Sequence, residues 1–207
     1  MGTIKSNLEV RVEVLEKKNK ELEKKLSVLQ GKAAIKLSKK LGIGDTFEIL
    51  GLMWTILDIT DKGYVCLSDR LEESMQFDSD CNNWQASDLR KYLNTKFYDE
   101  LASAVGADNI IPFERDLWSL DGQTEYGTCE DKVSLISLDE YRKYRSLIPN
   151  VGYWWWMLTP DSTKCNGDSQ YVRVVCSSGV IRHWNYNNCS GVRPFCIFSS
   201  DLFESEE

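Results

Sequence analysis

Few side chains in this 207-residue sequence combine the types and the spacing that catalysis requires. The chain has one histidine, His183, so a serine or cysteine nucleophile activated by an imidazole would have to use it. His183 lies among Arg182, Trp184 and Asn185, a polar and aromatic setting that is typical of an exposed contact residue. The motifs of zinc proteases, serine hydrolases and phosphate-binding loops do not occur in the sequence. We therefore expect no catalytic residue and predict that the protein is not an enzyme.

Metal binding is also poorly supported by the sequence. Zinc-binding cysteines usually come in pairs with about two to four residues between them. The closest pair among the seven cysteines, Cys189 and Cys196, has six residues between its members. The candidate calcium ligands in loops are Asp78, Asp80, Asp161 and Asp168. They are not gathered in one loop, as a calcium site requires, so we expect solvated carboxylates, no metal and no cofactor.

Charge divides the chain into a basic N-terminal part and an acidic remainder. Residues 1–40 hold eleven Lys/Arg and five Asp/Glu, a net charge of +6, whereas the rest holds fourteen and twenty-seven, a net charge of −13. An acidic body argues against nucleic-acid binding, and no apolar run approaches the length of a membrane span. Since the N-terminus lacks an apolar signal segment, we expect no signal peptide, a protein that is cytoplasmic when made, and reduced thiols.

Residues 8–29 repeat apolar side chains every seven residues, with leucine at each d position. The e positions are glutamates and the g positions are basic, so neighbouring chains in a parallel assembly face opposite charges. This pattern predicts a parallel coiled coil that joins copies of the chain. Asn19 at an a position favours two strands, whereas Arg11–Glu16 resembles a trimerisation signature; a trimer is narrowly favoured and a dimer is the alternative. The seam residues are Leu8, Val12, Leu15, Asn19, Leu22, Leu26 and Leu29.

After Gly42 and Gly44, the hydrophobic pattern changes to a period of two, which is typical of strands. We predict an antiparallel meander and further short strands, and expect residues 110–131 to be irregular. The expected strands are Phe47–Leu50, Met53–Ile59, Tyr64–Leu67, Lys132–Ile136, a tryptophan strand at Trp154–Trp156, Tyr171–Cys176, Val180–Trp184 and Val192–Phe198.

Two helices are expected between these strands. Ser87 can cap one whose apolar residues recur at three and four, and Ser137 with Glu140 forms a capping box for a second that runs to about Leu147. The fold class is therefore α+β. The predicted organisation is a coiled-coil helix at 1–31, a linker or helix at 32–43, a globular domain at 44–200 and an acidic tail at 201–207.

Residues 161–190 form a polar segment between two apolar ones, Tyr153–Pro160 and Gly191–Phe198. The polar segment is rich in tyrosine, tryptophan, arginine, serine and asparagine, the side chains that adaptable binding surfaces use. Its alternative interpretation is a plain pair of solvated hairpin loops. The candidate ligand-binding residues are Ser162, Thr163, Asn166, Asp168, Tyr171, Arg173, Ser177, Ser178, Ile181, Arg182, His183, Trp184, Asn185, Tyr186, Asn187 and Asn188.

Four motifs together resemble a widespread bacterial and phage domain family. Trp154–Pro160 and Gly191–Phe195 resemble its W-W-L-R-S-P … G-V-R-P-A ending, although Met157 and Thr159 replace the usual Arg and Ser. The two upstream motifs are G-D-T-F followed by W-T-I-L-D within residues 44–58, and Trp84 followed by S-D-L-R-K-Y-L-N at residues 87–94. The resemblance covers about residues 42–198.

The resemblance implies a C-type-lectin-like fold and a likeness to the variable proteins of diversity-generating retroelements, in which mutagenesis directed at adenines rewrites C-terminal codons. It thus implies a ligand-display protein of a phage or prophage, a protein or glycan ligand, and a place in the phage particle. Two alternatives remain. Formylglycine-generating oxidases share the fold and use a cysteine pair, for which Cys189 and Cys196 are the candidates here. The other is a structural or cell-surface domain without a variable site.

Overall fold

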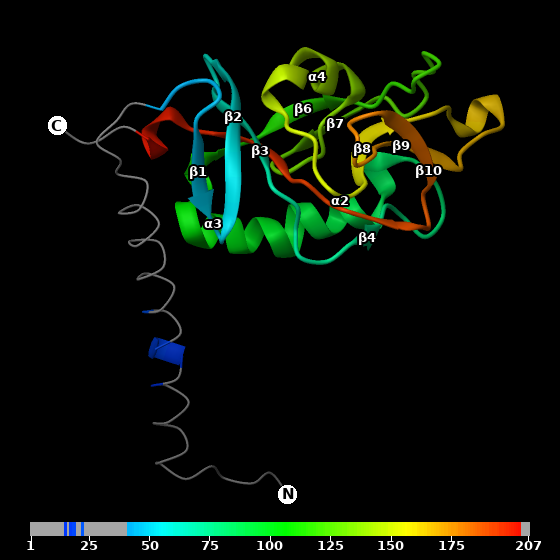
Figure 1. Cartoon of the computed structure of the whole chain (residues 1–207). Helices are drawn as coiled ribbons and strands as arrows, with labels where there is room; N and C mark the ends of the chain where they lie inside the picture. The colour runs from blue at the N-terminus through cyan, green and yellow to red at the C-terminus, as the bar shows by residue number, and fades with distance from the viewer. Residues whose placement is uncertain (1–14, 16, 20–21, 23–40, 204–207) are drawn as a thin grey trace, which may run out of the picture.

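The computed structural model describes residues 15, 17–19, 22 and 41–203 of the chain (Figure 1). Within these residues, the globular part combines short helices with strands that pair antiparallel, apart from one isolated parallel bridge between Trp155 and Gly191. The α+β class with mostly antiparallel strands is therefore confirmed.

The larger sheet begins with the meander that the alternating sequence predicts. β1 (Thr46–Ile49), β2 (Leu52–Thr60) and β3 (Gly63–Ser68) pair in order. β12 (Phe195–Phe198) then pairs with β3, and β5 (Ile110–Ile111) completes the order β1-β2-β3-β12-β5. The last strand of the chain thus lies inside the sheet, and every residue of β12 is buried.

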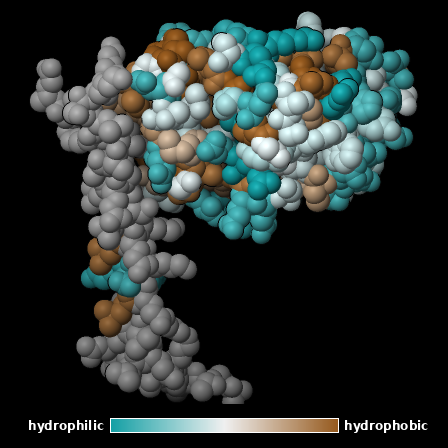
Figure 2. Space-filling model, viewed as in Figure 1, coloured by the Kyte–Doolittle hydropathy of each residue, from teal (hydrophilic) through white to brown (hydrophobic). Residues whose placement is uncertain are grey.

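The smaller sheet has the order β10-β9-β8 and contains most of the polar segment. It consists of β8 (Trp155–Pro160), β9 (Tyr171–Val175) and β10 (Ile181–Asn185). β11 (Cys189–Ser190) pairs separately with β4 (Met75–Gln76). The smaller sheet lies at the end of the globular part opposite β1 (Figure 1), where hydrophilic residues dominate the face drawn in Figure 2.

One long helical segment crosses the larger sheet. α2 (Asp88–Tyr92), a π-helical turn (Leu93–Phe97) and α3 (Tyr98–Val105) follow one another without a break. As predicted, Ser87 is the N-cap, and its side chain accepts a hydrogen bond from the backbone N–H of Arg90. The face that packs on the core includes Leu89, Leu93, Phe97 and Leu101.

A second helix, α4 (Leu138–Lys143), begins with the predicted capping box. Ser137 and Glu140 exchange side-chain-to-backbone hydrogen bonds. The same Glu140 carboxylate accepts two hydrogen bonds of 2.6 Å from the Arg115 guanidinium, which also donates to the Leu135 carbonyl at 3.0 Å. The cap therefore also ties α4 to the strand that carries Arg115. The short 3-10 helices are Trp84–Ala86, Ala107–Asn109, Arg145–Leu147, Lys164–Asn166 and Ser200–Leu202.

Some local predictions are wrong. Residues 110–131, expected to be irregular, contain β5 and the hairpin of β6 (Phe113–Asp116) with β7 (Thr128–Asp131). Residues 132–136, expected to be a strand, make a single bridge between Ser134 and Phe195. α4 ends before Leu147, and β12 starts after Pro194, which has no N–H to offer a ladder. These segments depend on distant partners, which a local pattern does not reveal.

Side chains of the Trp84–Asn94 motif bind the first helix to the end of β7 and to the residues directly after it. Trp84 donates its indole N–H to the buried carboxylate of Asp131 at 2.7 Å, and Arg90 donates Nε to the other oxygen at 2.6 Å. Asn94 donates to the Val133 carbonyl at 2.7 Å and accepts from two backbone N–H groups of the same segment. These side chains therefore stabilise the buried part of the globular domain, which we call the frame, and they do not form a surface site.

The adjacent residues Trp155 and Trp156 pack into two different hydrophobic clusters. Trp156 is buried with Val172 and Val174 in one hydrophobic cluster, whereas Trp155 is buried with Phe195 in the other. Alternation along β8 sends the two rings to opposite sides of the strand. The apolar segment before the polar one is thus an internal brace, as the sequence suggests.

Part of the expected coiled-coil seam is described. Leu15, Asn19 and Leu22 are helical, and Leu15 and Leu22 are 63% and 58% exposed. Other predicted positions lie outside the described residues: Leu8, Val12, Leu26, Leu29, the linker up to residue 40 and the tail from residue 204. In the part of the chain that the structure describes, no helix is both long and apolar enough to cross a membrane.

Candidate binding face

A hollow of about 610 Å³ opens on the smaller sheet beside its edge strand β10. It is lined by Trp154, Tyr171, Arg173, Ile181, Arg182, His183, Trp184, Asn185 and Asn188. All of these residues except Trp154 belong to the contact set that the sequence predicts. We call this set of lining residues the β10 face.

The β10 face is open because β10 is an edge strand, paired with β9 on one side only. Val172 and Val174 of β9 are fully buried, whereas Arg182, His183 and Trp184 of β10 are exposed. A buried strand therefore fixes the position of an exposed neighbour through a ladder of backbone hydrogen bonds. Side chains on β10 can change without disturbing the packing of β9.

Asp161, directly after β8, organises the polar part of the face. Its carboxylate lies 2.6 Å from Nε of Arg173 and 3.1 Å from Nδ1 of His183, two residues that are opposite each other in the β9–β10 register. The Tyr171 and His183 rings lie 4.8 Å apart. Burial raises the pKa of Asp161, and the charge of Arg173 and the contact with His183 oppose that rise. The ion pair fixes Arg173 and leaves most of His183 open to solvent.

An exposed pair of indole rings forms the apolar part of the face. Trp154 and Trp184 are 38% and 39% exposed, and their ring centroids lie 5.2 Å apart at an interplanar angle of 60°. Partly exposed tryptophans supply a large contact area with few rotatable bonds. The sequence places Trp154 in the apolar segment Tyr153–Pro160 and does not predict a contact role for it. Its neighbours Trp155 and Trp156 are indeed buried.

Ser162 and Thr163 were predicted to contact a ligand, and this prediction is wrong. Both are buried, at 7% and 0% exposed. Asn82 holds their loop, because its amide donates to the backbone carbonyls of Ser162 at 3.0 Å and Tyr171 at 2.9 Å. The Tyr126 hydroxyl in turn donates to the Asn82 side chain at 2.7 Å. Sequence reasoning missed Asn82, since its loop partners are far away in the chain.

A second anchor of this loop is Asp121. It accepts hydrogen bonds from the Ser162 hydroxyl at 2.7 Å and the Asn166 amide at 3.0 Å. Hydrogen bonds from Ser119, Ser162 and Asn166 lower the pKa of Asp121 and so favour its charged form. Asn166 is exposed, as predicted, but its amide serves the loop. Asp168 is half-buried and accepts from the backbone N–H of Gln170 at 3.1 Å.

The remaining predicted contact residues divide between surface and frame. Ser177 and Ser178 are exposed in the turn between β9 and β10, and Asn187 is exposed after β10. Tyr186 is half-buried and packs against the core, and its carbonyl accepts the backbone N–H of Phe77 at 2.9 Å. Tyr186 thus connects the β10 end to the frame.

The cysteines do not form an exposed pair. All seven are free of disulfides. Cys196 is fully buried on β12 opposite Cys66 on β3, and burial raises the pKa of both thiols well above the ordinary value. Cys189 is exposed on β11. This arrangement does not support the oxidase alternative. Across the described residues, no group of three His, Cys, Asp or Glu side chains could hold a metal ion.

Arg193 has a structural role. It is 2% exposed, donates Nε to the Ser68 carbonyl at 2.8 Å, and lies over the Trp155 ring at 4.9 Å. The G-V-R-P-F motif thus fastens the last strand to β3 and to the tryptophan brace.

Comparison with known proteins places the chain in a family. No curated protein and no solved structure matches it. The family model described as Domain of unknown function (DUF6273) matches residues 61–200. The match spans more than half of the chain, from the β2–β3 turn to the end of the globular part, and includes every residue of the β10 face. The chain therefore belongs to the DUF6273 family.

Proposed function

We propose that this protein displays a variable-type contact surface, the β10 face, and that the face binds a protein or glycan ligand. The observation that carries the proposal is the hollow of about 610 Å³, which gathers the aromatic, cationic and amide side chains of the polar segment on an exposed edge strand. Hollows of this size are ordinary for ligand sites. The exposed indoles supply contact area, and Arg182, His183 and Asn185 supply hydrogen bonds.

The proposed scaffold is a C-type-lectin-like fold. Its support is the position of the C-terminal strand inside the main sheet and a separate small sheet that carries the polar segment. On this scaffold the tryptophan brace and Arg193 stay fixed while β10 side chains vary. A fixed core with variable surface residues fits a variable protein of a diversity-generating retroelement from a phage or prophage. Such a protein would be made in the cytoplasm and carried in the phage particle.

We further propose that a parallel coiled coil bundles several copies, with a trimer favoured and a dimer as the alternative. The described seam leucines, Leu15 and Leu22, are more than half exposed in the single chain. This exposure is expected of residues that a partner helix would bury. Bundling would raise avidity through effective concentration. Light scattering of the full chain should give a multiple of the mass of 23.8 kDa, and L15K/L22K should reduce it to one chain. A monomeric unmodified chain would contradict the coiled coil.

Exchange of exposed residues on the β10 face (Arg182 and Trp184) and beside it (Ser177 and Asn187) tests the display function. The combined variant S177A/R182S/W184S/N187D should abolish binding to a ligand selected on the unmodified protein, because these residues supply contact area and hydrogen bonds. Its melting temperature should change little, since surface substitutions typically alter stability by about 0.5 kcal/mol or less each. Calorimetric titration and thermal unfolding measure the two effects.

The matched control carries substitutions of the same kind at exposed positions away from the β10 face, W118S/R142S/S146A. It should keep full ligand binding. If the face variant unfolds, or if both variants bind ligand equally well, the β10 face is not a display surface.

A further inference from the structure

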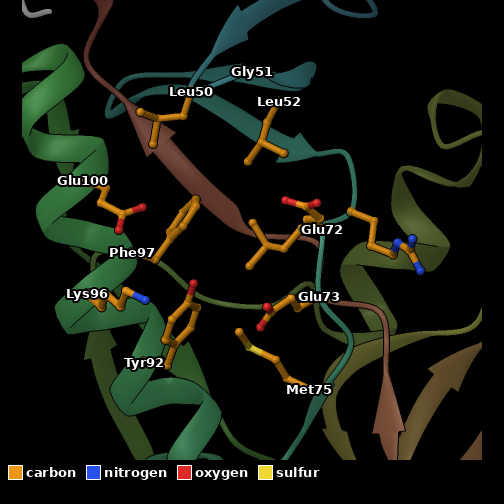
Figure 3. Close-up of a pocket in the computed structure, with 12 residues that line it drawn as sticks. Leu50, Gly51, Leu52, Glu72, Glu73, Met75, Tyr92, Lys96, Phe97 and Glu100 are labelled. Atoms are coloured by element: carbon orange, nitrogen blue, oxygen red, sulfur yellow. The ribbon is translucent and has the colours of Figure 1, made fainter.

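A second hollow lies away from the β10 face and shares no residue with it. Its volume is about 520 Å³, and it is bounded by the β1–β2 turn, residues 70–75 and the helical segment around the π-helical turn. In Figure 3, Glu100 and Tyr92 of the helical segment face Glu72 and Glu73 across the opening. We call this hollow the helix groove.

The floor of the helix groove is apolar. Leu71 and Phe97 are buried there, and Leu52, Met75 and Tyr92 are partly exposed. A partly open apolar floor between two walls can take up side chains from a partner segment. The floor belongs to the main hydrophobic core, so its shape is fixed by the packing of the domain.

The rim of the groove carries excess negative charge. Glu72, Glu73 and Glu100 are exposed, and within the described part of the chain their carboxylates make no hydrogen bond or ion pair. Of the two cations at the groove, Arg70 stacks its guanidinium on the Tyr153 ring at 4.5 Å. Among the described residues that line the groove, Lys96 is therefore the one cation left to oppose three carboxylates, and it lies 5.9 Å from the centre of the Tyr92 ring.

The rim carboxylates also act on Tyr92 in the floor of the groove. Burial, followed by the charges of Glu100 and Glu73, raises the pKa of Tyr92. A ligand cation entering between the walls would therefore meet unpaired carboxylates and the face of an aromatic ring, which together favour ammonium and guanidinium groups.

Leu50 gives an independent indication that the groove is used. It has a φ of 59° and is followed by Gly51 with a φ of 72°, in a two-residue turn that joins β1 and β2. Asparagine or glycine normally occupies this left-handed position, where a leucine is strained. Leu50 is also 43% exposed at the mouth of the groove. Leucine is unfavourable at this position, both in the left-handed turn and in contact with water. Contact with a partner would explain why it is there.

We propose that the helix groove binds a basic amphipathic peptide segment of a partner protein. Lysine or arginine side chains of the segment would pair with Glu72, Glu73 and Glu100, and its apolar side chains would contact the floor and Leu50. The occupant is argued from charge complementarity and from the apolar floor between the charged walls. The proposal is independent of the β10 face.

The test uses the full chain and a fluorescein-labelled hexapeptide of alternating lysine and leucine. Binding is followed by fluorescence anisotropy. E72Q/E73Q should weaken peptide binding about tenfold, as expected when two charge contacts are lost. E114Q/E130Q is the matched control, because it removes two exposed glutamates that face each other on β6 and β7, away from the groove. It should change the dissociation constant by less than about twofold.

Equal weakening by both double variants would mean general attraction to an acidic protein and would overturn the proposal. So would equal binding of a lysine–serine hexapeptide, because the apolar floor would then contribute nothing. A change in molecular mass of E72Q/E73Q on light scattering would show that another copy of this chain occupies the groove, which also contradicts a separate partner.

Substitution of Leu50 should change stability and peptide binding in opposite directions. L50N should raise the melting temperature, because asparagine suits the left-handed turn, and should still weaken binding of the lysine–leucine hexapeptide severalfold. L120N is the control, since Leu120 is equally exposed at 43% and does not line the groove. Unchanged peptide binding by L50N would show that Leu50 has no contact role and would remove that support from the proposal.

Discussion

Replacing Trp156 by alanine should lower the free energy of unfolding by about 3–5 kcal/mol, as for other fully buried large-to-small substitutions. Trp156 is 0% exposed, donates its indole N–H to the Met75 carbonyl at 2.8 Å, and packs edge-on against Phe77 at 5.7 Å. The substitution removes this ring from the core and leaves the Met75 carbonyl without this donor. It also removes a link between β8 and β4, so the support of the binding face weakens with the core.

The neighbouring Trp154 is a natural control for this prediction. It has the same side chain, but it is 38% exposed and lies against Trp184 on the β10 face. W154A should therefore cost about 1 kcal/mol or less in stability, while it weakens ligand binding. Urea denaturation of both variants, with the slope compared as well as the midpoint, measures the difference. Equal stability losses would show that the two adjacent rings are not divided between core and surface.

Replacing Arg90 by alanine should also cost about 3–5 kcal/mol, because it leaves the buried carboxylate of Asp131 without its charge partner. Asp131 is 2% exposed and is held by Arg90 at 2.6 Å and by the Trp84 indole at 2.7 Å. The guanidinium also donates to the Glu130 carbonyl at 3.0 Å. A lysine at position 90 cannot reproduce this forked arrangement, so R90K should recover part of the loss at most.

R142A is the matched control for the Arg90 prediction. Arg142 pairs with Asp139 at 3.1 Å, but both side chains are largely exposed, at 60% and 91%. Exposed pairs contribute about 0–1 kcal/mol, so R142A should be nearly neutral. The two arginine variants are compared by chemical denaturation. A stability loss for R90A within about 1 kcal/mol of that for R142A would mean that solvent reaches Asp131 and replaces the arginine.

These two expected losses concern the frame, and they explain why the proposed display surface can tolerate change. Trp156 and Arg90 are held by segments far away in the chain, whereas Arg182, His183 and Trp184 of β10 are exposed to solvent. Substitution of frame residues should therefore change stability, and substitution of face residues should change ligand choice. Frame residues contribute to the free energy of folding through burial. Face residues contribute to the free energy of ligand binding through contact.

Local sequence signals predicted the features that neighbouring residues decide. Alternation placed β1, β2 and β3, and Ser87 and Ser137 marked the starts of α2 and α4. Such signals are reliable because a cap and its N–H, or a strand and its two faces, lie within a few residues of each other. The composition of residues 161–190 predicts a contact-rich segment.

The tertiary structure alone decided which of those residues face solvent. Asn82 draws Ser162 and Thr163 inward, and the edge position of β10 turns Arg182 and Trp184 outward beside Trp154. The β6–β7 hairpin and the helix groove arise in the same way, from segments that meet only after folding. Exposure depends on pairing between segments far apart in sequence, and no local periodicity contains that information. The sequence determined what kinds of side chain were available, and long-range packing determined which of them a ligand could reach.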